Sequence, residues 1–234
     1  ICATMHFFPG GTLLKSYDLV HWEIAAHVFE RLDDTPAEQL EGEQSIYGKG
    51  MWAASLRYHK DTFYVCFASY DTGKTYIYRT KNINEPWEKR SLDGVYHHPS
   101  LLFDEDGRIY MGYGFNEVRI LELNDTLTAP KEGGFERLLV EEKQDAYISY
   151  EGAHFYKKDG TYYIFVIQWL KGNLTQREQL CLYGDSLDGE FKKEMVFSEN
   201  LGFPMKGVAQ GGIVDTPEGD WYSVMYQEHG AIGK

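Results

Sequence analysis

The chain has 234 residues, of which 43% are hydrophobic, and this is enough for one large domain with a packed core. A formal net charge of -13 argues against a nucleic-acid partner, because phosphate binding needs clustered Lys and Arg. No run approaches 18 apolar residues, and no basic start precedes an apolar stretch, so we expect neither a membrane span nor a signal peptide. The compartment is left open, with the cytoplasm favoured.

The N-terminal part of the chain is predicted to contain strands and one long loop. Residues 1–11, ICATMHFFPGG, resemble the second strand of a hairpin, so its first strand is expected ahead of Ile1. Residues 12–23, TLLKSYDLVHWE, continue as a strand and a turn. Residues 35–50, rich in Glu and Gly, are predicted to form a long loop.

Four segments of 13 residues then align without a gap, and each ends in a tyrosine. Each has a short apolar strand, a polar turn and a second apolar strand, which is typical of a β-hairpin. Further strand-and-turn pieces follow the hairpins, and no helical periodicity interrupts them. The segments are WAASLRYHKDTFY (52–64), HPSLLFDEDGRIY (98–110), EGAHFYKKDGTYY (151–163) and QGGIVDTPEGDWY (210–222).

The spacing of these hairpins predicts the fold class. The final tyrosines recur after 46, 53 and 59 residues, which allows about four strands in each repeat. Such repeats favour an all-β, five-bladed β-propeller, whereas a sandwich is not expected to repeat one hairpin in register four times. We predict a single domain over residues 1–234 with incomplete first and last blades, because the N-terminal first strand and the C-terminal closure are expected to be missing.

One position recurs at the start of each hairpin, twelve residues before the tyrosine. It holds Trp52, His98, Glu151 and Gln210. If the innermost strand of each blade begins there, the four side chains converge on the mouth of the central channel, where polar groups make a plausible site. The alternative is that symmetry alone brings them together and they only fill the channel.

Three cysteines and many aromatic residues complete the composition. Cys2, Cys66 and Cys181 are an odd number without metal-type spacing, so we predict ordinary thiols. Aromatic residues make up 15% of the chain, which fits strands and also the stacking of rings on sugars.

Five motifs, taken together and in order, resemble family 43 glycoside hydrolases of the β-xylosidase and α-L-arabinofuranosidase branch. That resemblance implies a five-bladed β-propeller that inverts the anomeric centre with a general acid and a general base, both carboxylic acids. The motifs are GMWAASLRYH (50–59), GVYHHPSLLFDEDG (94–107), YEGAHFYKKDGTYYIF (150–165), GVAQGGIVDTPEGDWY (207–222) and HGAIGK (229–234).

The resemblance assigns two catalytic positions in this chain. Glu151 matches the general acid, which protonates the leaving glycosidic oxygen; the alternative is a water-exposed carboxylate at a strand end. His98 stands where the family has a modulating aspartate that favours the protonated acid. The general base, an aspartate, is expected about a dozen residues before Ile1, outside the chain.

A metal site made by His97 and His98 is an alternative reading of that motif. Adjacent residues of a strand point to opposite faces, so we expect the two rings to lie apart. A protonated histidine at position 98 would weaken Glu151 as an acid, whereas a neutral one could orient it by a hydrogen bond. The substitution therefore puts full activity in doubt.

The resemblance also implies contacts to sugar and metal. Phe8 and Trp52 match aromatic residues that contact the sugar, with core packing as the alternative. Gln210 is predicted to be a polar contact, because the glycines after it allow close approach of a ligand; the alternative is a channel filler. His229 matches a histidine that holds a structural Ca²⁺ in the channel, although calcium prefers oxygen ligands.

These observations predict an exo-acting, inverting glycoside hydrolase that releases terminal xylose or arabinose from xylan-derived oligosaccharides. We expect the chemistry to require no cofactor, and the resemblance implies a Ca²⁺ of structural role in the central channel. The alternative is a catalytically impaired, carbohydrate-binding propeller, suggested by His98 and the absent base. The choice between xylose and arabinose, and the oligomeric state, are not encoded in any pattern that we can read.

Overall fold

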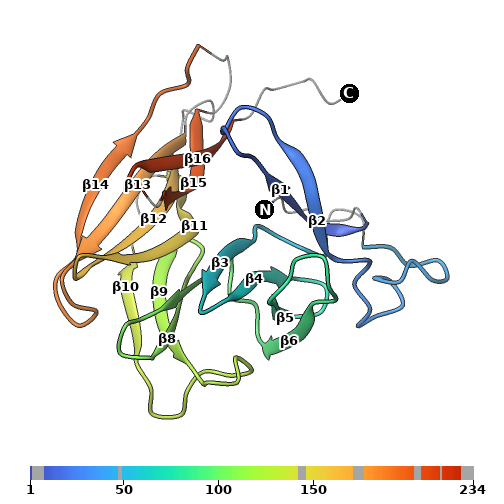
Figure 1. The fold of residues 1–234 in the computed structure, drawn as a ribbon. Coiled ribbons are helices and arrows are strands. Elements are labelled where there is room, and N and C mark those ends of the chain that lie inside the picture. The colour runs from blue at the N-terminus through green and yellow to red at the C-terminus, as the bar shows by residue number, and fades with distance from the viewer. Residues whose placement is uncertain are drawn as a thin grey trace. The chain divides into compact units, whose positions relative to one another are not determined.

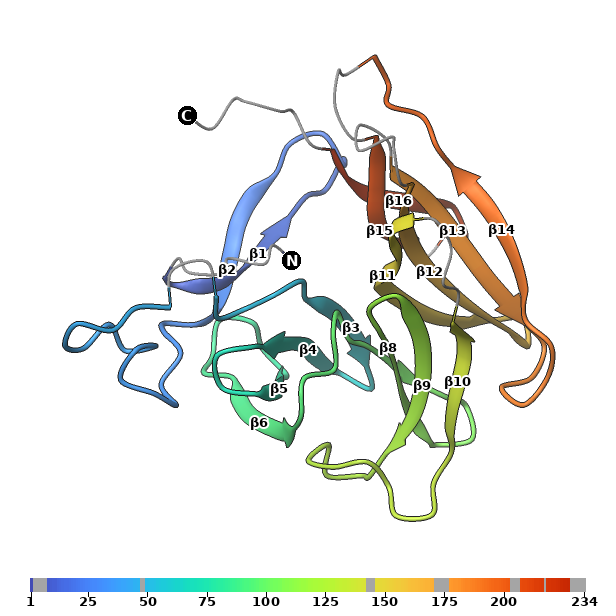
Figure 2. The ribbon, with the colours of Figure 1, turned by 180° about the vertical axis from the view of Figure 1, so that it is seen from behind.

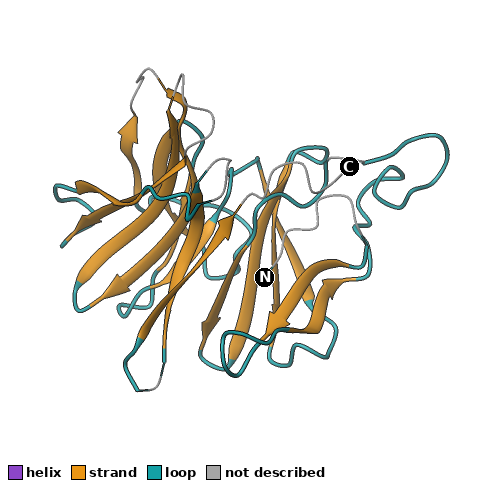
Figure 3. Cartoon of the chain, turned by 90° about the horizontal axis from the view of Figure 1, so that it is seen from above, coloured by secondary structure: helices purple, strands orange, loops and turns teal. Residues whose placement is uncertain are grey.

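The computed structural model describes residues 1, 8–46, 49–141, 146–170, 177–202, 207–216 and 218–227, with only the backbone of Tyr147. In these ranges every regular element is a β-strand, which confirms the predicted all-β class (Figures 1 and 3). None of these residues forms a helix that could cross a membrane. The strands are β1 (Gly10–Lys15), β2 (Glu23–Phe29), β3 (Ser55–His59), β4 (Thr62–Ser69), β5 (Lys74–Thr80), β6 (Glu88–Asp93), β7 (Ser100–Phe103), β8 (Ile109–Tyr113), β9 (Glu117–Leu123), β10 (Glu136–Glu141), β11 (Ala146–Lys158), β12 (Thr161–Leu170), β13 (Arg177–Gly184), β14 (Lys192–Phe197), β15 (Val208–Asp215) and β16 (Trp221–Gln227).

The chain divides into two compact units. Unit 1 contains residues 1–110 and 122–135, and unit 2 contains residues 111–121 and 136–234. Unit 1 holds the pair β1-β2 and the four-stranded sheet β3-β4-β5-β6, whereas unit 2 holds the sheet β11-β12-β13-β14 and the pair β15-β16 (Figures 1 and 2). A further four-stranded sheet, β10-β9-β8-β7, contributes strands to both.

The core of unit 1 follows from the apolar central strands of its sheet. Phe67 of β4 and Tyr76 of β5 are fully buried, and their rings lie 5.5 Å apart. Leu13 and Val28 from the β1-β2 pair belong to the same buried cluster. Such strands, apolar at nearly every position, are typical of sheets that are covered on both faces.

The core of unit 2 depends on alternation along β12. Tyr162, Ile164 and Val166 are buried, whereas the residues between them are half-buried. Phe155 of β11 is also fully buried, and its ring contacts Tyr162 at a centroid distance of 6.2 Å. This period of two places one face of the sheet against the core.

The four predicted hairpins are present, but their turns differ. Lys60-Asp61 and Asp159-Gly160 are two-residue turns in which both residues have positive φ, as a type I′ turn requires. The other two turns are longer: the N–H of Asp104 donates to the carbonyl of Arg108, and Thr216 makes the same contact with Asp220. The gapless sequence repeat therefore hides a difference in turn length.

The predicted loop over residues 35–50 has no strand in its described part, and it contains one deeply buried acid. Glu38 is 0% exposed, and its Oε2 accepts hydrogen bonds from the N–H groups of Asp34 at 2.8 Å and Thr35 at 3.2 Å. Its Oε1 has no hydrogen-bond partner within the described ranges. The loop is thus anchored by a carboxyl group that is only half satisfied.

Candidate functional site

In unit 1, the recurring position lies just before the strands rather than inside them. Trp52 precedes β3, which begins at Ser55, and His98 precedes β7, which begins at Ser100. The two rings lie near each other, with centroids 6.3 Å apart. His98 has a φ of 47°, a left-handed conformation that Asn, Asp and His adopt more readily than other non-glycine residues.

The expectation that His97 and His98 point apart is wrong. Their rings stack at a centroid distance of 3.7 Å with 23° between the planes, and both residues are buried. Alternation applies only to extended backbone, and the positive φ of His98 breaks it. His97 is held from its other side by the hydroxyl of Tyr70, whose oxygen lies 2.5 Å from Nδ1.

Trp52 is the centre of this aromatic group. Its ring centroid lies 5.3 Å from that of Tyr70 and 6.1 Å from that of His97. The indole Nε1 is buried, and the structure gives this donor no acceptor in the part of the chain that it describes. Because a buried N–H is costly when unpaired, Trp52 offers a hydrogen bond that a ligand could accept.

Phe8 is half-buried and packs beside the core cluster of unit 1. Its ring meets Phe29 edge to face at a centroid distance of 6.5 Å. The packing alternative therefore accounts for at least one side of this ring. Contact with a sugar stays a prediction for Phe8.

In unit 2, Glu151 lies within β11 between two irregularities of the strand. From Ile148 to Glu151, and again from Glu151 to His154, β11 advances three residues while β12 advances two. Each extra residue is a β-bulge, a feature that re-aims side chains and is common beside active sites. Glu151 is half-buried, so its carboxyl is neither sealed in the core nor free on the surface.

Gln210 is also presented by a bulge. Ala209 pairs with Tyr226 and Gly212 with Val224, so Gln210 and Gly211 together face a single residue of β16. Gln210 has a φ of 59°, and its side-chain amide makes no hydrogen bond to any described residue.

The Gln210 side chain lies against the backbone next to Glu151. A Cβ added to Gly152, which has a φ of 71°, would come within 2.9 Å of Gln210 Cγ. A side chain at position 152 would therefore collide with Gln210. Glu151 and Gln210 are thus neighbours within unit 2. Because the placement of the two units relative to one another is not determined, convergence with Trp52 and His98 stays a prediction.

Two supporting residues were not identified from the sequence. The side-chain oxygen of Asn116 accepts a hydrogen bond from the N–H of Ser149 at 2.9 Å, and its own N–H donates to the carbonyl of Tyr150 at 2.8 Å. Asn116 thereby fixes the backbone directly before Glu151. An asparagine in a turn, here with a φ of 60°, was the available signal. The second residue is Gln179, whose side-chain oxygen accepts a hydrogen bond from the N–H of Gln210. No sequence pattern around Gln179 indicated this role.

The described cysteines are unsuited to chemistry. Cys66 and Cys181 are buried and free. Burial raises the pKa of the Cys66 thiol far above its ordinary value, and it raises the pKa of Cys181 to about 12. Both stay protonated at neutral pH and are therefore poor nucleophiles. Cys2 lies outside the described residues, as does His229, so the calcium prediction stays a prediction.

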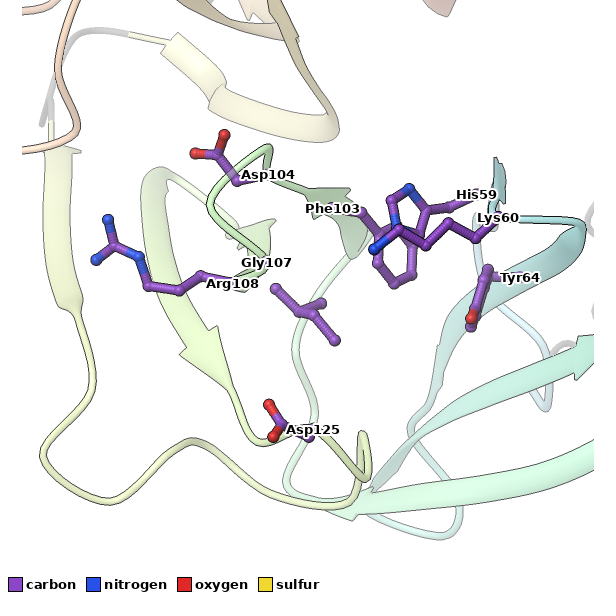
Figure 4. Close-up of a pocket in the computed structure, with 9 residues that line it drawn as sticks. His59, Lys60, Tyr64, Phe103, Asp104, Gly107, Arg108 and Asp125 are labelled. Atoms are coloured by element: carbon purple, nitrogen blue, oxygen red, sulfur yellow. The ribbon is translucent and has the colours of Figure 1, made fainter.

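A separate pocket of about 200 Å³ lies in unit 1 at the turns of two hairpins (Figure 4). His59 and Phe103 stack there with centroids 4.6 Å apart, and the ring of Tyr64 also contacts Phe103. His59 lies at the far end of β3 from Trp52, seven residues along the chain and so on the order of 20 Å away. The pocket is therefore distinct from the Trp52 and His98 group.

Comparison with known proteins places the chain. The model of glycosyl hydrolases family 43 matches residues 1–232. A β-xylosidase of Formosa agariphila is 26% identical over 244 residues, which cover 95% of this chain and 41% of that protein. A non-reducing end α-L-arabinofuranosidase of Bacteroides ovatus is 28% identical over 235 residues, with coverage of 96% and 42%.

A solved structure gives the same answer. A bifunctional GH43-CE protein of Bacteroides eggerthii superposes with a TM-score of 0.86 and 36% identity, covering 96% of this chain and 29% of that one. The chain spans about two fifths of the length of the curated relatives that it matches. Because the family model extends over nearly every residue, the chain belongs to glycosyl hydrolases family 43.

Proposed function

We propose that the protein is an exo-acting, inverting glycoside hydrolase that releases terminal xylose or arabinose from xylan-derived oligosaccharides. The observation that carries the proposal is a family 43 match over residues 1–232 in which Glu151 falls at a bulged, half-buried strand position. Relatives named as a β-xylosidase and as an α-L-arabinofuranosidase support this substrate class. We also propose a five-bladed propeller, which the five described antiparallel sheets support.

Glu151 acts as the general acid in this proposal. Its carboxyl protonates the glycosidic oxygen as the bond to the anomeric carbon breaks, so that the leaving sugar departs as a neutral alcohol. Water activated by a general base attacks the opposite face of the sugar.

Two further groups contribute binding in this proposal. The side-chain amide of Gln210, which has no hydrogen-bond partner among the described residues, offers two N–H donors and a carbonyl acceptor to sugar hydroxyls close to Glu151. The half-buried indole of Trp52 offers a flat apolar face and one buried N–H donor. Sugar rings need both kinds of contact, because their C–H faces are apolar and their edges carry hydroxyl groups.

His98 occupies the position of the family's modulating aspartate. Its stacking on His97 fixes the ring plane, so the imidazole can orient a carboxyl group only through a nitrogen at its edge. In the competing proposal the protein binds sugar without turnover. His98 is the residue that distinguishes the two.

The principal test is Glu151→Gln in the whole protein, assayed with 4-nitrophenyl xyloside, 4-nitrophenyl arabinofuranoside and xylobiose. We expect kcat on xylobiose to fall by about 10² to 10⁴-fold, because general acid catalysis is lost. The fall on the 4-nitrophenyl substrates is expected to be smaller, because 4-nitrophenolate leaves without protonation. Equal rates for the variant and the wild type on all three substrates would refute the assignment.

A matched control is Glu178→Gln, in the same sheet. Glu178 accepts a hydrogen bond from Gln168 at 2.5 Å and lies away from the repeat positions. It should leave all three rates within about twofold, since it holds no substrate.

A second variant, His98→Asp, tests the competing proposal. Aspartate tolerates positive φ, so the backbone should accept the change. Turnover by the variant, where the wild type only binds sugar in calorimetry, would show that the histidine causes the loss of activity. Clear turnover by the wild type would exclude the binding-only proposal.

A further inference from the structure

The bulge of β15 leaves two backbone N–H groups without partners in the strand ladder. One side chain from another sheet accepts hydrogen bonds from both. The Oε1 of Gln179 in β13 accepts hydrogen bonds from the N–H of Gln210 at 2.8 Å and of Gly211 at 3.3 Å. Its Nε2 donates to the carbonyl of Val166 at 3.0 Å. Gln179 is only 2% exposed, so these contacts lie away from bulk water.

The geometry explains why a glutamine is needed there. An apolar side chain of similar size would fill the space but would leave two buried N–H groups unpaired, which costs more than a lost surface hydrogen bond. The bulge itself cannot slide to a regular ladder without moving the left-handed Gln210. The Gln179 amide therefore stabilises a backbone conformation that the strand pairing alone does not.

Gln179 also stands in line with the proposed acid. Glu151 of β11 pairs with Ile167 of β12, and Ile167 pairs with Gln179 of β13. Two strand spacings separate Glu151 from Gln179, which is about 10 Å. The chain of contact then runs from Gln179 to the backbone of Gln210, and from the Gln210 side chain to Gly152 beside Glu151.

We propose that Gln179 is a positioning residue, which holds the Gln210 bulge and so sets the Gln210 amide against the sugar beside Glu151. It touches no substrate itself. The proposal rests on the proposed glycosidase function for its kinetic consequences, but the hydrogen-bonding role can be tested without catalysis.

The experiment compares Gln179→Met with the wild type in the whole protein. We expect KM for 4-nitrophenyl xyloside or arabinofuranoside to rise about tenfold while kcat changes by less than about threefold, because a binding contact is displaced and the acid is kept. Hydrogen exchange at the Gln210 and Gly211 amides should speed up by at least about tenfold, since both lose their acceptor.

Two further variants separate positioning from general destabilisation. Gln179→Glu keeps a carboxylate or carboxyl oxygen as acceptor and should restore most of the amide protection. Gln168→Met removes a similar glutamine hydrogen bond one rung along the same sheet and should change neither KM nor the exchange at residues 210 and 211.

A double variant gives the decisive comparison. If Gln179 acts through Gln210, then adding Gln179→Met to Gln210→Ala should raise KM by less than about twofold further. The proposal would be overturned if the two substitutions raised KM multiplicatively in the double variant. It would also be overturned if hydrogen exchange at the Gln210 and Gly211 amides were unchanged in Gln179→Met. If the wild type hydrolyses neither glycoside, the proposed function fails, while the exchange data still decide whether Gln179 holds the bulge.

Discussion

The two units build the same repeat position by different means. In unit 1 the position is fixed by ring packing: Trp52 and His98 lie in a group of aromatic side chains. In unit 2 it is fixed by the backbone, through bulges at Glu151 and Gln210. The same repeat position can therefore be stabilised in two ways. Packing of aromatic rings fixes it in unit 1, and a β-bulge that presents a polar side chain fixes it in unit 2.

We expect the greatest loss of stability from a substitution in the β-bulge at Gln210 in unit 2. A Cβ at position 211 would lie 2.0 Å from the carbonyl oxygen of Val224, so Gly211→Ala forces the two strands apart. We expect a loss of about 3 kcal/mol in the free energy of unfolding, measured by urea denaturation. Gly189→Ala, whose nearest atom would be 3.4 Å away, is the control. Equal stability for both variants would show that the strand pair yields freely.

A smaller loss of stability is expected when the aromatic packing around Trp52 in unit 1 is disrupted. Trp52→Leu removes the ring contacts to Tyr70 and His98 and leaves part of the space empty. Since Trp52 is half-buried, we expect a loss of about 2 kcal/mol, below that of a fully buried tryptophan. Trp22→Leu, on a residue that is 46% exposed and whose indole N–H donates only locally to the carbonyl of Leu19, should cost less, about 1 kcal/mol at most. A loss for Trp22→Leu as large as that for Trp52→Leu would contradict the packing argument.

A pH-dependent effect is expected in unit 1 from the buried carboxyl of Glu38. Burial, together with the nearby Asp71 carboxylate, raises the pKa of Glu38 to about 7 from 4.5. Between these two values the folded chain keeps a proton that the unfolded chain has lost. The stability contributed by protonated Glu38 is therefore complete below pH 4.5 and is lost as the pH rises through 7.

The variant Glu38→Gln tests this assignment, because an amide keeps the shape and never loses a proton. It also supplies an N–H donor where Oε1 lacks a partner among the described residues. We expect the variant to be more stable than the wild type by about 1 to 2 kcal/mol at pH 8 and equally stable at pH 5. Thermal melts at both pH values measure the difference. A gain of the same size at both would show that titration is not involved.

We expect the least loss of stability from removing the hydrogen bond that holds His97 in its stack on His98. Tyr70→Phe removes the hydroxyl that contacts His97 Nδ1 but keeps the ring beside Trp52. We expect a loss of about 1 kcal/mol, typical of one hydrogen bond. Tyr17→Phe, on a side chain that is 91% exposed, is the control. No measurable change in Tyr70→Phe would mean that packing alone fixes His97.

Much of the fold could be predicted from local chemistry. The dipeptides Lys60-Asp61 and Asp159-Gly160, placed between apolar runs, predict hairpins, and both turns have the positive φ that such turns need. The turn beginning at Asp104 is longer, and no gap in the sequence repeat reveals it. Turn length does not set the burial of the aligned tyrosines either: Tyr110 is fully buried and Tyr222 is 40% exposed, although both follow a turn of the longer kind.

The candidate site was predictable in its residues but not in its backbone. Glu151 and Gln210 share a repeat position, and the Gln210 side chain lies beside Gly152 in unit 2. Bulges arise from competition between strand pairing and side-chain packing, so they leave no local pattern, and the stacking of His97 on His98 could not be foreseen. Gln179 was missed for a related reason, since its partners come from a strand that is distant in the sequence.

The left-handed backbone at positions 98 and 210 limits which side chains can be exchanged there. Asn, Asp and Gly fit such a conformation at little cost, whereas Val, Ile and Thr do not. A library that seeks a new sugar preference at position 210 should therefore favour short polar residues over branched ones. Aspartate and histidine both tolerate the left-handed backbone at position 98, so the charge of that position can be altered without rebuilding the backbone that carries it, although aspartate loses the ring stacking on His97.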